Sequence, residues 1–215
     1  MSKKILRKKL INIRRNNFVD QTISFDHFKK IFKKYNLKKN INIGGYYPIN
    51  SEISCLDVLE ILEKKNFKIS LPITKKNNNM DFYEWSFQDS LKISQQGIPE
   101  PNTKKKVIPD VLIVPIVGFD RSKFRLGYGG GFYDRYISKI LKFKKILTVG
   151  FAFSFQEIST IPINKFDKKL NYPDIIILNK LDDFMNFSKL ELSNYCKVFD
   201  GDVYLMYFNK SKVSC

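Results

Sequence analysis

Histidine and cysteine are scarce in this sequence of 215 residues, and the scarcity removes several kinds of site. There is one histidine, His27, and there are three cysteines, none of them in a C-x-x-C pair. Structural zinc sites take four such ligands at close spacing, so no zinc site is expected. A catalytic triad could use only His27, which lies in a segment with the pattern of a surface helix, and we assign it no catalytic role.

Long apolar runs are missing as well. The longest, VLIVPIVGF and DIIILN, are far shorter than the roughly 20 residues that span a bilayer. The basic residues MSKKILRKKLINIRRNN are not followed by an apolar stretch, so we expect no secretory signal. The sequence therefore predicts a cytoplasmic protein with no membrane partner, and we expect a monomer or a weak dimer.

Acidic residues are far fewer than basic ones. The chain has 38 Lys and Arg against 21 Asp and Glu, a formal net charge of +17. Such an excess is typical of nucleic-acid-binding proteins. The lysines are spread along the whole chain, however, and they do not alternate with aromatic residues as a base-stacking surface requires. A phosphorylated or polyanionic small substrate agrees with the charge at least as well, and nucleic-acid binding stays open as the weaker alternative.

The chain does have an alternation of helical and strand-like segments. Helical spacing of apolar residues predicts helices over 3–17, 24–39, 51–66 and 132–143. Apolar or alternating runs predict strands over 41–49, 67–73, 81–87, 107–119, 144–153 and 174–179, with a loop over 95–106 and a hairpin near Gly201. This order predicts an α/β fold: a mainly parallel central sheet flanked by helices on both faces, three-layered and Rossmann-like. We expect residues 1–179 to form a single domain and residues 180–215 to form an extension packed on it.

The stretch FRLGYGGGFYDR, residues 124–135, places four glycines between a buried strand and a helix. Glycines let a backbone approach a phosphate closely, and a helix start presents free N–H groups to an anion. Arg125 and Arg135 add cationic donors. The stretch is neither a Walker A loop nor a dinucleotide fingerprint, since it lacks Gly-Lys-Ser/Thr and the G-x-G-x-x-G spacing. It predicts a phosphate ligand, and a loop that needs its glycines only for close packing is the alternative. Asp134 either caps the new helix or holds Mg²⁺ against phosphates.

Taken together, GFDRSKFRLGYGGGFYDRYI, residues 118–137, resembles the long motif of 5-formyltetrahydrofolate cyclo-ligases. That motif runs G/A-F-D, a few residues, then R-L-G-x-G-x-G-[YF]-Y-D. Further matches follow in the family's order: KKILR at 3–7, YYPINSEIS at 46–54, GIPEP at 97–101, VGFAFSFQ at 149–156 and IPINKFD at 161–167. The resemblance covers roughly residues 3–178.

The resemblance implies an ATP- and Mg²⁺-dependent enzyme that converts 5-formyltetrahydrofolate to 5,10-methenyltetrahydrofolate. It implies catalytic roles for Arg125 and Tyr133, and metal ligands at Asp134 and Asp167. The implied substrate-binding residues are Tyr46, Tyr47, Glu52 and Tyr133. The implied ATP-binding residues are Lys3, Lys4, Arg7, Arg125, Leu126, Gly127, Tyr128, Gly129, Gly130, Gly131, Phe132 and Tyr133.

Two positions depart from the family pattern. Phe166 stands where many relatives have histidine before the loop aspartate, which puts the metal role of Asp167 in question. Gly130 stands where some relatives have lysine, which removes one phosphate-binding side chain. A divergent member with another nucleotide-linked activity is therefore a further alternative.

Overall fold

The computed structural model describes residues 2–18, 25–122, 124–163, 174–178 and 203–206. The helices are α1 (Lys3–Asn16), α2 (Phe25–Lys34), α3 (Leu56–Lys64) and α4 (Phe132–Ile140), with short 3₁₀ turns η1 (Lys76–Asn78) and η2 (Ser154–Gln156). The strands are β1 (Asn42–Gly44), β2 (Lys68–Lys75), β3 (Asn79–Trp85), β4 (Leu91–Ile93), β5 (Pro99–Pro101), β6 (Lys106–Val107), β7 (Val111–Pro115), β8 (Gly118–Phe119), β9 (Arg125–Leu126), β10 (Leu147–Phe153), β11 (Asp174–Leu178) and β12 (Val203–Met206).

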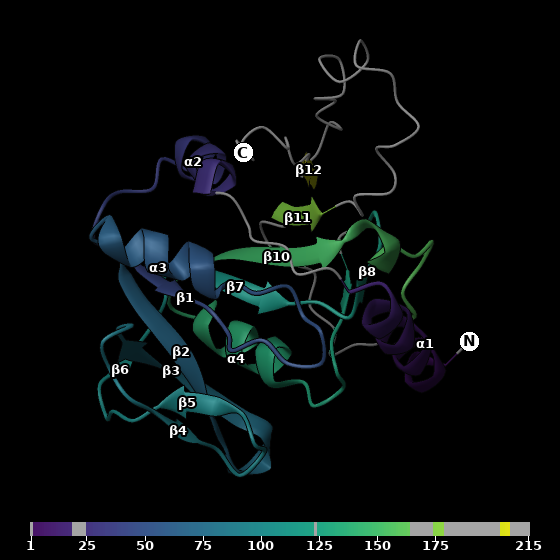
Figure 1. The fold of residues 1–215 in the computed structure, drawn as a ribbon, viewed down its shortest axis with the longest axis horizontal. Helices are drawn as coiled ribbons and strands as arrows, with labels where there is room; N and C mark the ends of the chain where they lie inside the picture. The colour runs from purple at the N-terminus through teal and green to yellow at the C-terminus, as the bar shows by residue number, and fades with distance from the viewer. Residues whose placement is uncertain (1, 19–24, 123, 164–173, 179–202, 207–215) are drawn as a thin grey trace, which may run out of the picture.

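Eight of these strands form one sheet in the order β12-β11-β10-β7-β1-β2-β3-β6 (Figure 1). The six strands from β12 to β2 run parallel to one another. The strand β3 is antiparallel to both β2 and β6. The prediction of an α/β fold around a mainly parallel sheet is therefore confirmed, while the finer assignment to a three-layered Rossmann-like fold stays a prediction.

Alternate residues of the central strand β7 supply two different hydrophobic clusters. Val111 and Ile113 pack in the cluster that contains the buried side of α3. Leu112 and Val114 pack in the cluster that contains Tyr136 and other residues of α4. Successive side chains of a strand point to opposite faces, so this strand is covered on both sides. Such burial explains why its sequence is continuously apolar.

The helix α1 lies apart from these clusters, next to β8 (Figure 1). Its Leu6 and Leu10 pack with Val117, which precedes β8, and with Leu126 of β9. The approach is close: a Cβ at Gly118 would stand 2.6 Å from Leu10 Cδ1. This packing brings the amino-terminal turns of α1, with their basic side chains, beside the glycine stretch.

Some sequence predictions are wrong in detail. The loop predicted over 95–106 contains β5, which pairs antiparallel with β4. Two prolines do not prevent this pairing because a two-stranded hairpin consists of edge strands, where a missing N–H can face solvent. The helix predicted over 24–39 is too long, since α2 ends at Lys34 and Asn36 takes a left-handed conformation with φ 48°. The segment 41–49 was predicted as a strand with a loop at its end, and β1 does end at Gly44.

Other predictions lie partly or wholly outside the described residues. These are the first residue of the helix predicted over 24–39 and most of the hairpin near Gly201. The strand β12 pairs with β11 in parallel register, and the division into a domain over 1–179 and an extension over 180–215 stays a prediction. Among the residues that the structure describes, no helix is both long and apolar enough to cross a membrane.

Candidate functional site

A pocket of about 1030 Å³ opens beyond the carboxyl ends of β1 and β7, where ligands of parallel α/β sheets usually bind. Most residues predicted from the sequence line it. They are Lys3, Arg7, Tyr46, Tyr47, Glu52, Arg125, Leu126, Gly127, Tyr128, Gly129, Gly130, Gly131, Phe132, Tyr133 and Asp134. The exposed Lys4 does not line the pocket, and Asp167 lies outside the described residues.

The glycine stretch lies against arginine side chains of this same chain. Arg7 Nε donates a hydrogen bond to the Gly127 carbonyl oxygen over 2.7 Å. A Cβ at Gly129, whose φ is 105°, would stand 3.1 Å from Arg7 Cζ. A Cβ at Gly127 would stand 2.9 Å from Arg125 Nη1. These glycines therefore leave room for the chain's own guanidinium groups, whereas the sequence suggested that they leave room for a ligand.

At the start of α4, too, a glycine lies against an arginine side chain. Gly131 is the N-cap residue in the left-handed conformation, and no side chain caps the helix. A Cβ at Gly131 would stand 2.9 Å from Arg135 Nη1. Arg135 donates to the carbonyl oxygens of Asn78 and Gly130. The uncapped helix start, with cationic side chains around it, suits an anion.

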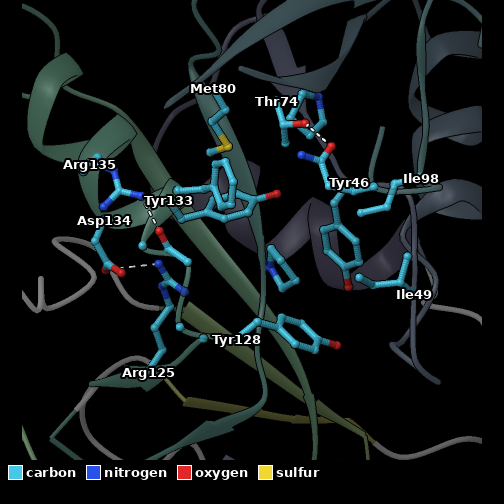
Figure 2. A pocket seen from close by; sticks show the side chains of 18 of the residues that line it. Tyr46, Ile49, Thr74, Met80, Ile98, Arg125, Tyr128, Tyr133, Asp134 and Arg135 are labelled. Carbon is cyan, nitrogen blue, oxygen red and sulfur yellow. Dashed lines mark hydrogen bonds and ion pairs between the residues drawn. The ribbon is translucent and has the colours of Figure 1, made fainter. Parts of the chain in front are cut away.

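Arg125 is the buried cation of the pocket, with a side chain 4% exposed. Its Nη2 donates to Asp134 Oδ1 over 3.1 Å, and its Cζ lies 5.5 Å from the centre of the Tyr133 ring. Its Nε is buried and has no hydrogen-bond partner among the described residues. Figure 2 shows Arg125, Asp134 and Arg135 together at one end of the pocket. The capping role considered for Asp134 is not observed, because Gly131 occupies the cap and Asp134 pairs with Arg125.

Carboxylates are few in this region. No cluster of three His, Cys, Asp or Glu that could hold a metal occurs in the described part of the chain. Asp134 is a partly exposed carboxylate on the pocket wall beside the glycine stretch, whereas the other two lining carboxylates, Glu52 and Glu100, are buried. A metal there would need further ligands from a bound molecule or from water.

Glu52 lies in a very different environment. Its side chain is buried, and its Oε2 accepts a hydrogen bond from the Ile49 N–H over 2.8 Å. Burial raises the pKa of Glu52 from its ordinary value to about 7. The Ile49 N–H, the charge of Arg14 and the hydroxyl of Tyr128 act in the opposite direction. Glu52 can therefore gain or lose a proton near neutral pH.

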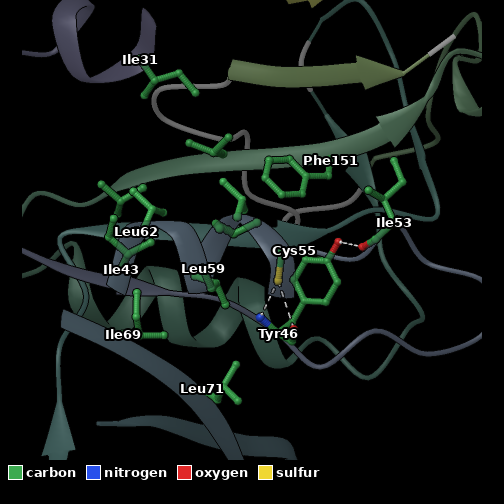
Figure 3. Close-up of a cluster of buried hydrophobic side chains, with 14 of the residues drawn as sticks. Ile31, Ile43, Tyr46, Ile53, Cys55, Leu59, Leu62, Ile69, Leu71 and Phe151 are labelled. Atoms are coloured by element: carbon green, nitrogen blue, oxygen red, sulfur yellow. Dashed lines mark hydrogen bonds between the residues drawn. The ribbon is translucent and has the colours of Figure 1, made fainter. Parts of the chain in front are cut away.

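Tyrosines form much of the wall around Glu52. Tyr46 is 3% exposed, and its hydroxyl donates to the Ile53 carbonyl oxygen over 2.7 Å, while Cys55 Sγ contacts its backbone (Figure 3). Burial raises the pKa of Tyr46 and of Tyr133 well above the ordinary value. Both side chains therefore stay neutral and present ring surface to the pocket.

Several residues of the site were missed by sequence reasoning. Thr74 and Gln96, whose side chains are hydrogen-bonded over 2.8 Å, line the wall formed by β2 and the β4–β5 hairpin with Ile98. The family match GIPEP at 97–101 covers part of that hairpin, but the sequence predicted a loop there and assigned it no site residue. Arg14 was missed too, although it lies seven positions after Arg7 and therefore on the same face of α1. It donates a hydrogen bond to the Tyr128 hydroxyl.

The fold and the pocket define an α/β protein that presents arginines and glycine backbone opposite a buried carboxylate and aromatic rings, which suits a small ligand with an anionic and a flat part. The chain belongs to the 5-formyltetrahydrofolate cyclo-ligase family, whose model matches residues 1–176. The resemblance noted in the sequence is thereby confirmed.

Two relatives illustrate the similarity. The chain is 32% identical over 136 residues to the 5-formyltetrahydrofolate cyclo-ligase of Haemophilus influenzae, covering 60% of this chain and 72% of that protein. It is 28% identical over 153 residues to the enzyme of the same name from Mycoplasma genitalium, covering 71% of this chain and 81% of that one.

Solved structures agree. The 5,10-methenyltetrahydrofolate synthetase of Aquifex aeolicus, determined by NMR, superposes with a TM-score of 0.59 at 29% identity, covering 81% of this chain and 90% of that one. A 5,10-methenyltetrahydrofolate synthetase from Mycoplasma pneumoniae superposes with a TM-score of 0.57 at 24% identity, covering 80% and 98% respectively. The second comparison bears on the fold alone.

Proposed function

We propose that this protein converts 5-formyltetrahydrofolate to 5,10-methenyltetrahydrofolate with ATP and Mg²⁺, releasing ADP and phosphate. One observation carries the proposal: a single pocket is lined by Lys3, Arg7 and Arg125 and also by Glu52 and Tyr133. The first group suits the phosphates of a nucleotide, and the second suits a reduced pterin. Family membership agrees with this assignment.

The phosphates of ATP would lie at the glycine stretch. Lys3 and Arg7 extend from α1 into the pocket, and Arg125 extends from β9. The buried guanidinium of Arg125 is fixed by Asp134 and by the Tyr133 ring, so it need not reorganise when charge develops on a transferring phosphoryl group. Preorganised cations of this kind are the main way in which proteins accelerate phosphoryl transfer.

The folate would lie on the Glu52 side. Tyr47 and Tyr133 line the pocket there and offer ring surface to the pterin. Glu52 in its ionised form would accept hydrogen bonds from N–H groups of the ring, while the nearby Tyr46 supports the wall through its bond to Ile53. Both ligands would thus meet within one pocket.

The proposed chemistry has two steps. The formyl oxygen of the substrate attacks the γ-phosphorus of ATP, and ADP leaves, which gives a phosphorylated imidate. N10 then attacks the formyl carbon, loses its proton, and phosphate leaves as the ring closes. Neither step needs a nucleophile from the protein, so the residues bind, align and neutralise charge.

Mg²⁺ fits the donor set at Asp134. This ion is usually held by one or two carboxylates together with phosphate oxygens and water. Asp134 lines the pocket with a side chain 29% exposed, and Asp167 is the second proposed ligand. When bound, the ion would neutralise phosphate charge.

The assay is direct. Purified protein given Mg-ATP and 5-formyltetrahydrofolate should produce the near-ultraviolet absorbance of the methenyl product. The increase should require ATP, and ADP should form in equal amount. Folded protein that gives no absorbance change would overturn the proposal. ATP hydrolysis without methenyl product would favour the divergent relative with another nucleotide-linked activity.

A further inference from the structure

Arg14 is a buried arginine that lies behind the pocket. It is 1% exposed, and it donates hydrogen bonds to three separate segments. Its Nε reaches the Asn50 carbonyl oxygen over 3.1 Å, and its Nη1 reaches the Ile116 carbonyl oxygen over 2.9 Å. Its Nη2 reaches the Tyr128 hydroxyl, and its Cζ lies 5.7 Å from the centre of that ring.

The three segments that Arg14 joins form the walls of the pocket. Asn50 belongs to the loop that carries Tyr46 and Glu52, Ile116 follows the end of β7, and Tyr128 belongs to the glycine stretch. A planar guanidinium can donate in several fixed directions at once, which a lysine ammonium on a flexible stem does poorly. Arg14 itself is not among the residues that line the pocket, so it would act on a ligand only through the residues that it holds.

Glu52 lies two positions after Asn50 in the loop that Arg14 holds. Its Oε2 accepts from the Ile49 N–H, and its Oε1 is buried with no hydrogen-bond partner among the described residues. Arg14 from α1 and Tyr128 from the glycine stretch act on the Glu52 carboxyl. Glu52 in turn raises the pKa of Tyr133 from α4 and of Tyr46 and Cys55 from the segment between β1 and α3, and these three groups stay neutral. Burial opposes the ionised form, whereas Arg14 and Tyr128 favour it. Among these groups Arg14 carries the positive charge.

We propose that Arg14 is a positioning residue that holds the Glu52 loop and the Tyr128 hydroxyl, so that the Glu52 carboxylate is supported and aligned to accept hydrogen bonds from the N–H groups of the folate. The proposal rests on the folate-binding role of Glu52 given above. It assigns the Tyr128 side chain to the Glu52 side of the pocket, although its backbone belongs to the glycine stretch. Removing the Tyr128 hydroxyl should therefore have little effect on the binding of phosphates at the glycine stretch.

A first experiment follows Glu52 without any ligand. The side-chain carboxyl of Glu52 is titrated by NMR in protein labelled with ¹³C at glutamate carboxyls, and its signal is assigned by its loss in Glu52→Gln. Arg14→Gln and Tyr128→Phe should both raise the titration midpoint above that of the wild type. Arg15→Gln is the matched control, since this neighbouring arginine is exposed, and it should leave the midpoint unchanged.

The outcomes of this experiment are decisive in either direction. An unchanged midpoint in folded Arg14→Gln or in Tyr128→Phe overturns the proposal. If Arg14→Gln fails to fold, Tyr128→Phe decides alone, because it removes one hydroxyl from a half-exposed ring and keeps the ring on Arg14. A fall in thermal stability with no change in the midpoint would mean that Arg14 serves only the fold.

A second experiment measures binding of 5-formyltetrahydrofolate in the absence of ATP, by calorimetry at pH 6 and pH 8. Ionised Glu52 should make wild-type affinity lower at pH 6. A midpoint raised by one unit in Tyr128→Phe would weaken binding at pH 6 by about a further tenfold, with little change at pH 8. If the wild type binds no folate, the proposed function fails, while the titration still tests the role of Arg14. If the wild type binds and Tyr128→Phe keeps the same pH dependence, the positioning role is wrong.

Discussion

The two halves of the pocket treat charge in opposite ways. At the glycine stretch, Arg7 and Arg125 donate to a carbonyl oxygen and to a carboxylate, and they lie over glycines that have no side chain to obstruct them. Around Glu52 a carboxylate is buried among tyrosines, and burial raises its pKa to about 7. One half holds permanent positive charge, and the other holds a group that titrates.

The difference follows from the groups themselves. A guanidinium group stays protonated at any physiological pH, so an arginine keeps its charge when other groups pack closely against it. A carboxylate instead responds to burial by binding a proton. Fixed cations on one side and a carboxylate of adjustable charge on the other suit the proposed pair of ligands, a polyanion and a ring system.

The largest effect is expected from removing the fixed charge at Arg125. Arg125→Ala should lower turnover by about 10²- to 10³-fold, the usual cost of removing one preorganised donor to a developing charge. Steady-state rates at varied ATP, with thermal unfolding measured alongside, test this. The control is Arg121→Ala, which removes equal charge from a side chain 85% exposed. Equal kinetics of the two variants would contradict the role of Arg125.

The titrating half predicts a pH-dependent stability. Because the folded-state pKa of Glu52 is raised to about 7, the folded protein binds more protons than the unfolded chain between its ordinary pKa and 7. The contribution of Glu52 to the free energy of unfolding should therefore fall as pH rises through that window, by a few kcal/mol at most, roughly 1.4 kcal/mol for each pKa unit.

Glu52→Gln tests this part of the comparison. The variant should gain stability relative to the wild type as pH rises from 4.5 to 8, and denaturant unfolding at several pH values measures the difference. A difference between the two proteins that does not change with pH would mean that Glu52 titrates like an exposed carboxyl.

The glycine stretch predicts a smaller effect, from crowding. Gly129→Ala would place a Cβ 3.1 Å from Arg7 Cζ at a φ of 105°, so it should displace Arg7 and raise the KM for ATP by about tenfold, or 1.4 kcal/mol. Gly97→Ala is a matched control, since its φ is also positive, at 75°, and its Cβ would meet nothing within 4 Å. Both should lose similar backbone stability. If both variants changed the KM for ATP equally, crowding of Arg7 would not be the cause of the effect of Gly129→Ala.

The smallest effect on stability is expected at Asp134. Asp134→Asn keeps an oxygen that can accept from Arg125 but removes the charge, and partly exposed ion pairs contribute about 0.2–1 kcal/mol. The variant should need more Mg²⁺ for half-maximal turnover, with its unfolding midpoint almost unchanged. A large loss of stability with unchanged Mg²⁺ dependence would assign Asp134 to structure alone.

Much of the fold was predictable because its signals are local. The apolar run 107–119 predicted one strand buried on both faces, of which residues 111–115 form β7 while the two ends belong to β6 and β8. Helical spacing predicted α1 and α4. The β4–β5 hairpin was not predictable, because β5 is the sequence Pro-Glu-Pro and pairs by its backbone. For the site, the motif around Arg125 led to one half of the pocket, and residues of the opposite wall such as Gln96 carry no motif.

By itself, the sequence determined the α/β alternation, the family, and the residues of the glycine stretch with Lys3, Arg7 and Glu52, since these depend on spacing along the chain. The tertiary structure alone decided what the glycines face, that Asp134 pairs with Arg125, and that Glu52 titrates near neutral pH. It alone placed Arg14, which meets Tyr128 across 114 positions of sequence. Burial and close approach depend on which distant segments pack together, and no local pattern encodes the resulting contacts or electrostatics.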